Sequence, residues 1–167
     1  MKKYLGVELG STRIKGVVID ESFAPVESGD FEWESTYDHG IWTYDLADAR
    51  EGLCQVLSQL KDREGLAAAG ISGMMHGYLA FDKDWNLLVP FRTWQNTITA
   101  DAAEQLTQLF QFNVPQRWSI AHLYQAILNG EPHVSQIAHI TTLSSYVHYM
   151  LLSLIHISEP TRHSLIS

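Results

Sequence analysis

The chain has 167 residues, of which 46% are hydrophobic, and this is enough to form one sizeable core. The formal net charge of −8 argues against a nucleic-acid or anionic-membrane surface, because neither polyanion would recruit an acidic partner. Cys54 is the single cysteine, which excludes an intramolecular disulfide and fits a reducing, cytoplasmic compartment. We therefore expect one domain with Cys54 buried as a small hydrophobic residue, and neither a signal peptide nor a transmembrane helix.

A small polar loop near the N-terminus, Gly10-Ser11-Thr12, separates two runs rich in Val and Ile, which predicts a β-hairpin. Gly10 lets the backbone approach an anion closely, while Ser11 and Thr12 offer hydroxyl and N–H donors to phosphate oxygens. Lys15 adds a charge-assisted contact, and Glu8 stands where a carboxylate could hold a hydrated Mg²⁺. The pattern indicates a phosphate-binding hairpin, with an ordinary hairpin turn as the alternative.

Strand and helix patterns alternate in the middle of the chain. Residues 25–34 predict an edge strand, and apolar residues at helical spacing over 46–60 predict an amphipathic helix. Residues 67–72 predict a short buried strand. Residues 76–82 predict a further strand, which pairs across a turn with 87–89.

A second polar cluster follows. Glycines flank Met75 and His76 at a predicted strand end, where ligands of α/β proteins bind. His76 can hydrogen-bond a sugar hydroxyl, and Trp94 offers a flat apolar face for sugar C–H groups. Gln95 and Asn96 present amide donors and acceptors. Each of these residues alone could equally be an ordinary core residue, but together they predict a small-molecule site.

From residue 99 onward the pattern is helical. Apolar stripes are predicted over 102–110 and 120–127, with Ser119 as the N-cap of the second helix and Gly130 just after its end. Paired strands, a crossover helix, another strand and then helices predict an α/β fold with a mixed sheet and helices packed against it.

Histidines and acidic pairs elsewhere carry less information. The chain has eight histidines, and those at 122, 133, 139 and 148 lack the spacing of a zinc site, so we expect most of them at the surface or half-buried. Asp82 and Asp84 are typical of turn-forming residues rather than of an acid/base pair.

The first twenty residues resemble the phosphate-1 motif of the actin, Hsp70 and sugar-kinase superfamily, Asp-x-Gly-[Ser/Thr]-x-x-x-[Lys/Arg]. Glu8, Gly10, Ser11 and Lys15 occupy its positions, and Glu8 replaces the usual Asp with a side chain one methylene longer. Residues 71–77, Ile-Ser-Gly-Met-Met-His-Gly, resemble a stretch of the xylulokinase-like FGGY carbohydrate kinases. Glycerol kinases carry an Arg-Glu pair where this chain has Met-His.

Three later segments extend the resemblance. Residues 92–97 resemble the sugar-binding stretch Leu-Trp-x-Asp-x-Arg, although Asn96 and Ile98 replace its Asp and Arg. Residues 119–132 resemble a helix that ends in an Asn-Glu-Pro turn, and residues 145–149 resemble the segment Asp-Tyr-Leu-x-Tyr. The resemblance thus covers roughly residues 4 to 152, in family order.

The resemblance implies an actin-like (ribonuclease H-like) α/β domain, here incomplete. It also implies a kinase that transfers the γ-phosphoryl group of ATP, with Mg²⁺, to a hydroxyl of a sugar, most simply a ketopentose such as xylulose. Glu8 would contact the metal. The nucleotide side would be formed by Glu8, Gly10, Ser11, Thr12 and Lys15, and the sugar side by Met75, His76, Trp94, Gln95 and Asn96.

By the same resemblance, residues 1–152 would be a partial N-terminal domain. FGGY enzymes are several hundred residues long, so we expect the catalytic-base Asp beyond residue 167 and no activity from this fragment. Residues 153–167 resemble a translated sequencing adapter, and we expect a non-native or divergent tail that packs poorly, without dense burial of Leu154 or Ile157. The full-length protein is expected in the cytoplasm, and a homodimer is compatible with the resemblance.

Two other functions remain open at this point. A different actin-like ATPase would account for the loop at 8–15 but would leave His76 and Trp94 without a role. A non-catalytic sugar-binding or assembly module would keep the fold and lose turnover.

Overall fold

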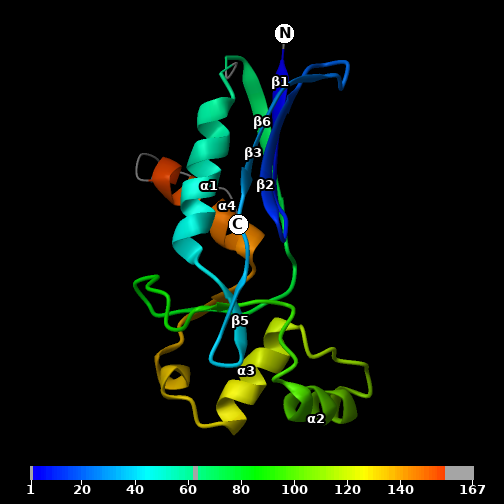
Figure 1. The fold of residues 1–167 in the computed structure, drawn as a ribbon, viewed down its shortest axis with the longest axis vertical. Coiled ribbons are helices and arrows are strands. Elements are labelled where there is room, and N and C mark those ends of the chain that lie inside the picture. The colour runs from blue at the N-terminus through cyan, green and yellow to red at the C-terminus, as the bar shows by residue number, and fades with distance from the viewer. Residues whose placement is uncertain (1, 62–63, 157–167) are drawn as a thin grey trace, which may run out of the picture.

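The computed structural model describes residues 2–61 and 64–156, with side chains described up to residue 152 (Figure 1). The molecule is elongated. A sheet with two helices forms one end, two further helices form the other, and short strands connect them.

The main sheet has the strand order β3-β2-β1-β6. Strands β1 (Lys3–Leu9) and β2 (Arg13–Ile19) form the predicted hairpin, and β3 (Pro25–Glu32) pairs with β2 in antiparallel fashion. Strand β6 (Leu66–Gly73) runs parallel to β1. This is the predicted mixed sheet, and because β1 and β6 are parallel, their carboxyl ends lie at the same edge.

Helix α1 (Leu46–Gln59) covers one face of this sheet, and Asp45 caps it by accepting a hydrogen bond from the Ala47 N–H. The approach is close: a Cβ on Gly52 would lie 2.4 Å from Cδ1 of Phe31. The predicted apolar stripe of this helix is confirmed, since every member is buried or half-buried. Helix α4 (Leu143–His156) packs against β6.

The other elements build the second half of the molecule. A three-stranded sheet and a two-stranded sheet lie beside two helices that enclose a small separate apolar cluster. The elements are β4 (Thr36–Asp38), β5 (Ile41–Tyr44), β8 (Phe91–Arg92), β7 (Leu79–Phe81), β9 (His139–Thr141), α2 (Ala100–Phe110), α3 (Ser119–Leu128) and the 3-10 helix η1 (Pro132–Gln136).

The predicted apolar face of α3 is only partly correct: Leu123 and Tyr124 are half-buried, and Tyr124 packs against the apolar cluster, but the two isoleucines are exposed. Ile120 and Ile127 are 41% and 48% exposed, whereas Ala121, His122, Gln125 and Ala126 are buried. The helix turns its small and polar residues inward because it packs closely against α2 and the aromatic residues of the neighbouring strands. The stripe predicted over 102–110 is likewise only partly buried, since Leu109 and Phe110 are exposed.

Ser119 is not the N-cap, because Trp118 holds that position and the Ser119 hydroxyl donates instead to the Gly77 carbonyl, at 2.5 Å. Cys54 lies on the exposed side of α1, contrary to expectation. Of the six histidines whose side chains are described, only His122 and His133 are buried, which agrees with surface or half-buried positions for most of them.

Two predicted strands also need correction. Residues 87–89 form no strand and contribute only a single bridge, Leu87 to Phe81, together with the hydrogen bond from the Leu88 N–H to the Ala80 carbonyl. Strand β6 exists as predicted over 67–72, but it is mostly exposed because it lies at the sheet edge.

Within the residues described, no helix combines the length and the apolar character needed to cross a membrane. The backbone of α4 is described through His156, whereas the side chains of 153–156 and all of 157–167 lie outside the described residues. The expectation that residues 153–167 pack poorly, including Leu154 and Ile157, falls on this undescribed part.

Candidate functional site

The loop Gly10-Ser11-Thr12 is held from behind by two aromatic side chains. Trp33 donates its indole N–H to the Gly10 carbonyl at 2.8 Å and its backbone N–H to the Thr12 carbonyl at 3.2 Å. Tyr44 stacks on Trp33 with ring centroids 4.4 Å apart and donates its hydroxyl to the Ser11 carbonyl at 2.8 Å. The loop carbonyls are therefore all occupied by donors from one side.

The donors of the same loop remain available. Ser11 and Thr12 are exposed, and within the described residues neither their N–H groups nor their hydroxyls form a hydrogen bond. The backbone at Gly10 is tight, because an added Cβ would lie 3.0 Å from the Arg13 carbonyl oxygen. A turn with its carbonyls tied back and its donors free is suited to phosphate.

Glu8 and Lys15 face each other across the hairpin. They are paired in the β1–β2 register, and their charged groups lie 3.5 Å apart with more than half of each side chain exposed. An exposed pair of this kind stabilises the fold little, so both groups can turn to a ligand at small cost. The Glu8 carboxylate fits a metal held through water, although the described residues contain no group of three or more side chains that could bind a metal.

The parallel pairing of β1 and β6 brings the two predicted clusters together. Glu8 lies beside Ser72, and the Met74 N–H donates to the Leu9 carbonyl, so the segment after β6 continues past the hairpin loop. A hollow of about 360 Å³ at this edge is lined by residues from both clusters: Glu8, Leu9, Gly10, Ser72, Gly73, Met74, Met75, His76 and Trp94. We call it the loop hollow.

A second hollow of about 540 Å³ adjoins the first, and we call it the arginine hollow. Its lining residues are His76, Trp94, Gln95, Asn96, Thr97, Gln116 and Arg117. His76 and Trp94 line both hollows, which makes them the boundary between the two. A still larger depression of about 710 Å³ lies over the sheet, where Lys15 and Glu8 line it together with glycines such as Gly6 and Gly70.

His76 is half-buried, and its ring stacks on Trp118 with centroids 6.5 Å apart. Burial, and then the nearby charge of Arg117, lower the pKa of His76, so the imidazole is neutral at pH 7 and can both donate and accept. Gly77 follows with φ of +122°, a conformation that favours glycine, and an added Cβ there would lie 2.7 Å from Cε2 of Phe91.

Of the three residues assigned to the sugar after β8, Trp94 is 43% exposed and presents its ring to both hollows. Gln95 accepts hydrogen bonds through Oε1 from Ser35 and Thr93, which leaves its amide N–H₂ without a partner in the described structure.

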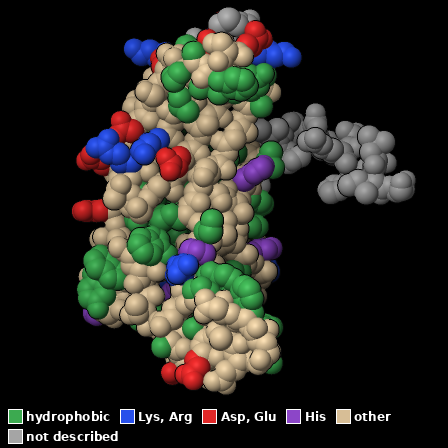
Figure 2. Space-filling view, turned by 90° about the vertical axis from the view of Figure 1, so that its right-hand side faces the viewer, with side chains coloured by type: hydrophobic (Ala, Val, Ile, Leu, Met, Phe, Trp, Pro, Cys, Tyr) green, Lys and Arg blue, Asp and Glu red, His purple; other side chains and the backbone are tan. Residues whose placement is uncertain are grey.

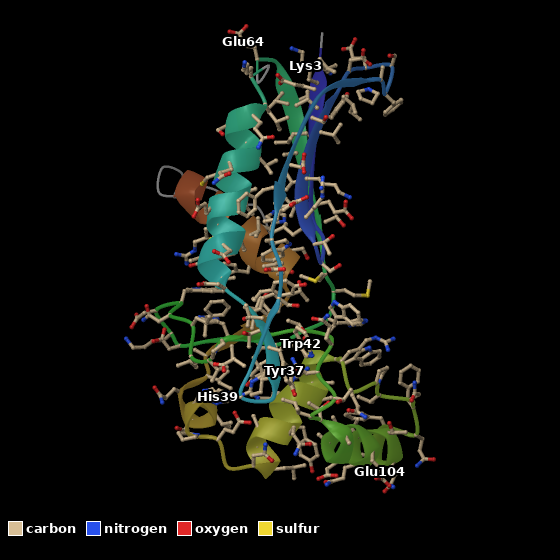
Figure 3. All side chains as sticks on the ribbon, viewed as in Figure 1. Lys3, Tyr37, His39, Trp42, Glu64 and Glu104 are labelled. Atoms are coloured by element: carbon tan, nitrogen blue, oxygen red, sulfur yellow. The ribbon has the colours of Figure 1, made fainter. Side chains whose placement is uncertain are left out.

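Asn96 serves the fold instead of presenting its amide to a ligand. It is 3% exposed, its Oδ1 accepts from the Trp42 N–H, and its Nδ2 donates to the carbonyls of Trp42 and Thr93. Trp42 lies on β5 near the middle of the molecule (Figure 3). Asn96 therefore ties the loop after β8 to β5, and it is a positioning residue for its neighbours.

An ion pair and a hydrogen bond hold the segments on either side of the two hollows in place. Arg92 pairs with Glu131 at 2.5 Å, and this hydrogen bond lowers the pKa of the Glu131 carboxyl. Tyr78 is hydrogen-bonded to His133 at 2.9 Å, and burial raises the pKa of Tyr78 to about 12. These side chains fix β8 and the segment after Gly77, which carry the boundary residues of the hollows.

Sequence reasoning missed several residues of the site. Trp33 was assigned only to an edge strand, and Tyr44 was not singled out, because their role depends on the loop that they reach in three dimensions. Arg117 precedes α3 in a connection without any motif, so the pattern gave no signal for it. A search for cations without a nearby acidic residue in sequence could have found it.

Comparison with known proteins bears on the fold. No protein-family model matches the chain. A glycerol kinase from Pseudarthrobacter chlorophenolicus is 28% identical over 120 residues, which are 65% of this chain and 23% of that protein. A structure of a xyloylose (xylulose) kinase from Brucella ovis matches with a TM-score of 0.82 and 23% identity, over 88% of this chain and 34% of that one. This chain has the fold of part of a carbohydrate kinase.

Further matches agree. A glycerol kinase from Plasmodium falciparum, solved with ADP, matches with a TM-score of 0.74 and 16% identity, over 89% of this chain and 34% of that one. Other matched structures are kinases of xylulose and of gluconate. The predicted resemblance and the actin-like α/β fold are thus confirmed, and the chain spans about a third of the matched structures and 23% of the curated relative.

Proposed function

We propose that the chain is the phosphate-binding and acceptor-binding part of an ATP-dependent carbohydrate kinase that phosphorylates a sugar hydroxyl; the resemblance to xylulokinases makes a ketopentose such as xylulose the first acceptor to test. The observation that carries this proposal is the loop hollow, in which Glu8 and Gly10 of the hairpin and the pair His76 and Trp94 face one space. The glycerol kinase solved with ADP supports nucleotide use by proteins of this fold.

The chemistry suits the residues present. Phosphoryl transfer depends on positioning and on neutralising charge rather than on covalent participation of the protein. Ser11 and Thr12 provide donors for phosphate oxygens, and Lys15 provides a positive charge. Glu8 would hold a hydrated Mg²⁺, which would add further charge neutralisation when bound. His76 and Trp94 would orient the sugar hydroxyl toward the loop.

We also propose that residues 1–152 belong to a partial N-terminal domain, and that the catalytic-base Asp lies in a segment beyond residue 167. The 167-residue chain would then bind ligands without turnover. A cytoplasmic location and a homodimer of the longer protein are part of the same proposal.

The test compares Glu8→Gln with Glu104→Gln, a matched change on α2 at the far end of the molecule (Figure 3). In the 167-residue chain, titration with ATP and Mg²⁺ is expected to show binding that Glu8→Gln weakens about tenfold or more, while Glu104→Gln leaves it unchanged. In the longer protein, Glu8→Gln should lower kcat strongly and leave the sugar KM near normal. Equal behaviour of the two variants would refute the role of Glu8.

The same titrations separate the alternatives. A sugar-specific shift in thermal midpoint without turnover in the longer protein would indicate a non-catalytic sugar-binding or assembly module. Nucleotide binding with no effect of any sugar would indicate a different actin-like ATPase. Turnover by residues 1–167 alone would contradict the proposed position of the base.

A further inference from the structure

The arginine hollow has an unusual charge. Arg117 is the one formally charged residue among its described lining residues, and no carboxylate lines it. The chain as a whole carries a formal charge of −8, so a hollow lined by an arginine and by no acidic residue stands out against the rest of the chain. On the face shown in Figure 2, one basic patch lies beside histidine side chains just below the middle of the molecule, and the acidic side chains in view lie away from it.

Arg117 is also free to bind a ligand. It is exposed and forms no ion pair within the described residues. Other cations near the site are engaged: Arg13 pairs with Asp30 at 2.8 Å, Lys15 with Glu8, and Arg92 with Glu131. An unpaired guanidinium in a concave site presents a planar set of donors that matches a carboxylate or a phosphate.

Polar groups around Arg117 are incompletely satisfied as well. Gln116 lines the hollow, and its side-chain oxygen is buried without a hydrogen-bond partner in the described structure. The Gln95 amide N–H₂ and the Thr97 hydroxyl form no hydrogen bond in the described structure. One cation together with a free amide donor and a free hydroxyl suits a polyol that ends in an anionic group.

The order of the residues along the two hollows determines how a polyol with an anionic end would lie. Gly10 lines the loop hollow, Arg117 lines the arginine hollow, and His76 and Trp94 line both. An extended acceptor with its reacting hydroxyl toward Gly10 therefore passes the boundary residues and directs its other end to Arg117.

We propose that Arg117 binds a carboxylate at the end of the acceptor opposite to the phosphorylated hydroxyl, so that the preferred acceptor is a sugar acid rather than a neutral ketopentose. This inference rests on the proposed kinase function and changes only the class of its acceptor. A carboxylate forms charge-assisted, bidentate hydrogen bonds with a guanidinium, whereas a neutral hydroxymethyl group forms one ordinary hydrogen bond.

The experiment uses pairs of polyols that differ only at one end: D-gluconate against D-glucitol, and D-xylonate against xylitol. Calorimetric titration of the 167-residue chain is expected to show at least tenfold tighter binding of each acid. Arg117→Gln should remove that preference and leave the neutral polyols unchanged, and Arg117→Lys should retain part of it. Lys83→Gln, which removes an equal charge from a surface turn where Lys83 pairs with Asp84, is the control and should change nothing.

Equal affinity for acid and neutral polyol, or an Arg117→Gln variant that keeps the preference, would overturn the assignment. Tighter binding of a sugar phosphate than of the sugar acid would also overturn it, because the anionic group would then be a phosphate. Xylulose binding that is independent of Arg117 would refute this inference and leave the kinase proposal intact. If the wild-type chain shows no binding of ATP and Mg²⁺ in titration, the kinase proposal itself is refuted.

Discussion

Replacing Gly77 by Ala tests the backbone that carries His76. Gly77 has φ of +122°, and an added Cβ would lie 2.7 Å from Cε2 of Phe91 and 2.9 Å from the Arg92 carbonyl oxygen. The backbone strain costs about 1–3 kcal/mol. Overpacking against a buried ring and a carbonyl adds about 1–3 kcal/mol. Gly77→Ala is therefore expected to lower the free energy of unfolding by about 2–6 kcal/mol.

Gly40→Ala is the matched control, because Gly40 also has positive φ, +82°, but an added Cβ would meet nothing within 4 Å. It should show the strain alone, about 1–3 kcal/mol. Urea denaturation of both variants, followed by tryptophan fluorescence, measures the difference. Gly77→Ala should also weaken sugar binding, since any relief of the clash displaces His76. The reasoning is refuted if Gly77→Ala costs no more than Gly40→Ala.

Two further predictions concern buried groups. Trp33→Phe removes the donor to the Gly10 carbonyl and should cost about 1–3 kcal/mol of stability while weakening phosphate binding, as measured by denaturation and by phosphate titration; an unchanged phosphate affinity would contradict the anchoring role. His122 is buried, neither of its ring nitrogens has a hydrogen-bond partner among the described residues, and burial lowers its pKa to about 4 from 6.5. Because the unfolded state protonates this imidazole at a higher pH than the folded state, the free energy of unfolding is unaffected above about pH 6.5. It falls by about 3 kcal/mol as the pH drops toward 4. His122→Leu should remove that part of the acid dependence in unfolding curves at pH 4.5 and pH 7, and an unchanged slope would show that another group is responsible.

The β1–β2 hairpin and helix α1 illustrate what local sequence patterns predict well. Alternation of apolar residues and the turn at Gly10 specified β1 and β2, and helical spacing specified α1, because in each case one face of a regular element must meet the core. For α3 the pattern predicted the helix but only part of its buried face. There the buried face consists of Ala, His and Gln, which fit a close contact with α2, and the larger Ile120 and Ile127 remain outside.

The candidate site divides in a similar way. The residue types at Glu8, Gly10, His76 and Trp94 indicated phosphate and sugar chemistry, and the structure places them around one hollow. The amide of Asn96 looked equivalent to that of Gln95 in sequence. Only the position of the β5 backbone decides that the Asn96 amide is used within the fold, because Trp42, which bonds to both its oxygen and its nitrogen, lies 54 residues away along the chain.

The sequence by itself determined the α/β class, the hairpin around Gly10 and the polar cluster that follows β6, because these depend on spacing within single elements. The tertiary structure decided which of those polar groups remain free. The carbonyls of the Gly10 loop are occupied by Trp33 and Tyr44, whereas Arg117 has no acidic partner in the described structure. Hydrogen bonds and ion pairs form between segments distant in sequence, so availability for a ligand is a property of the folded chain.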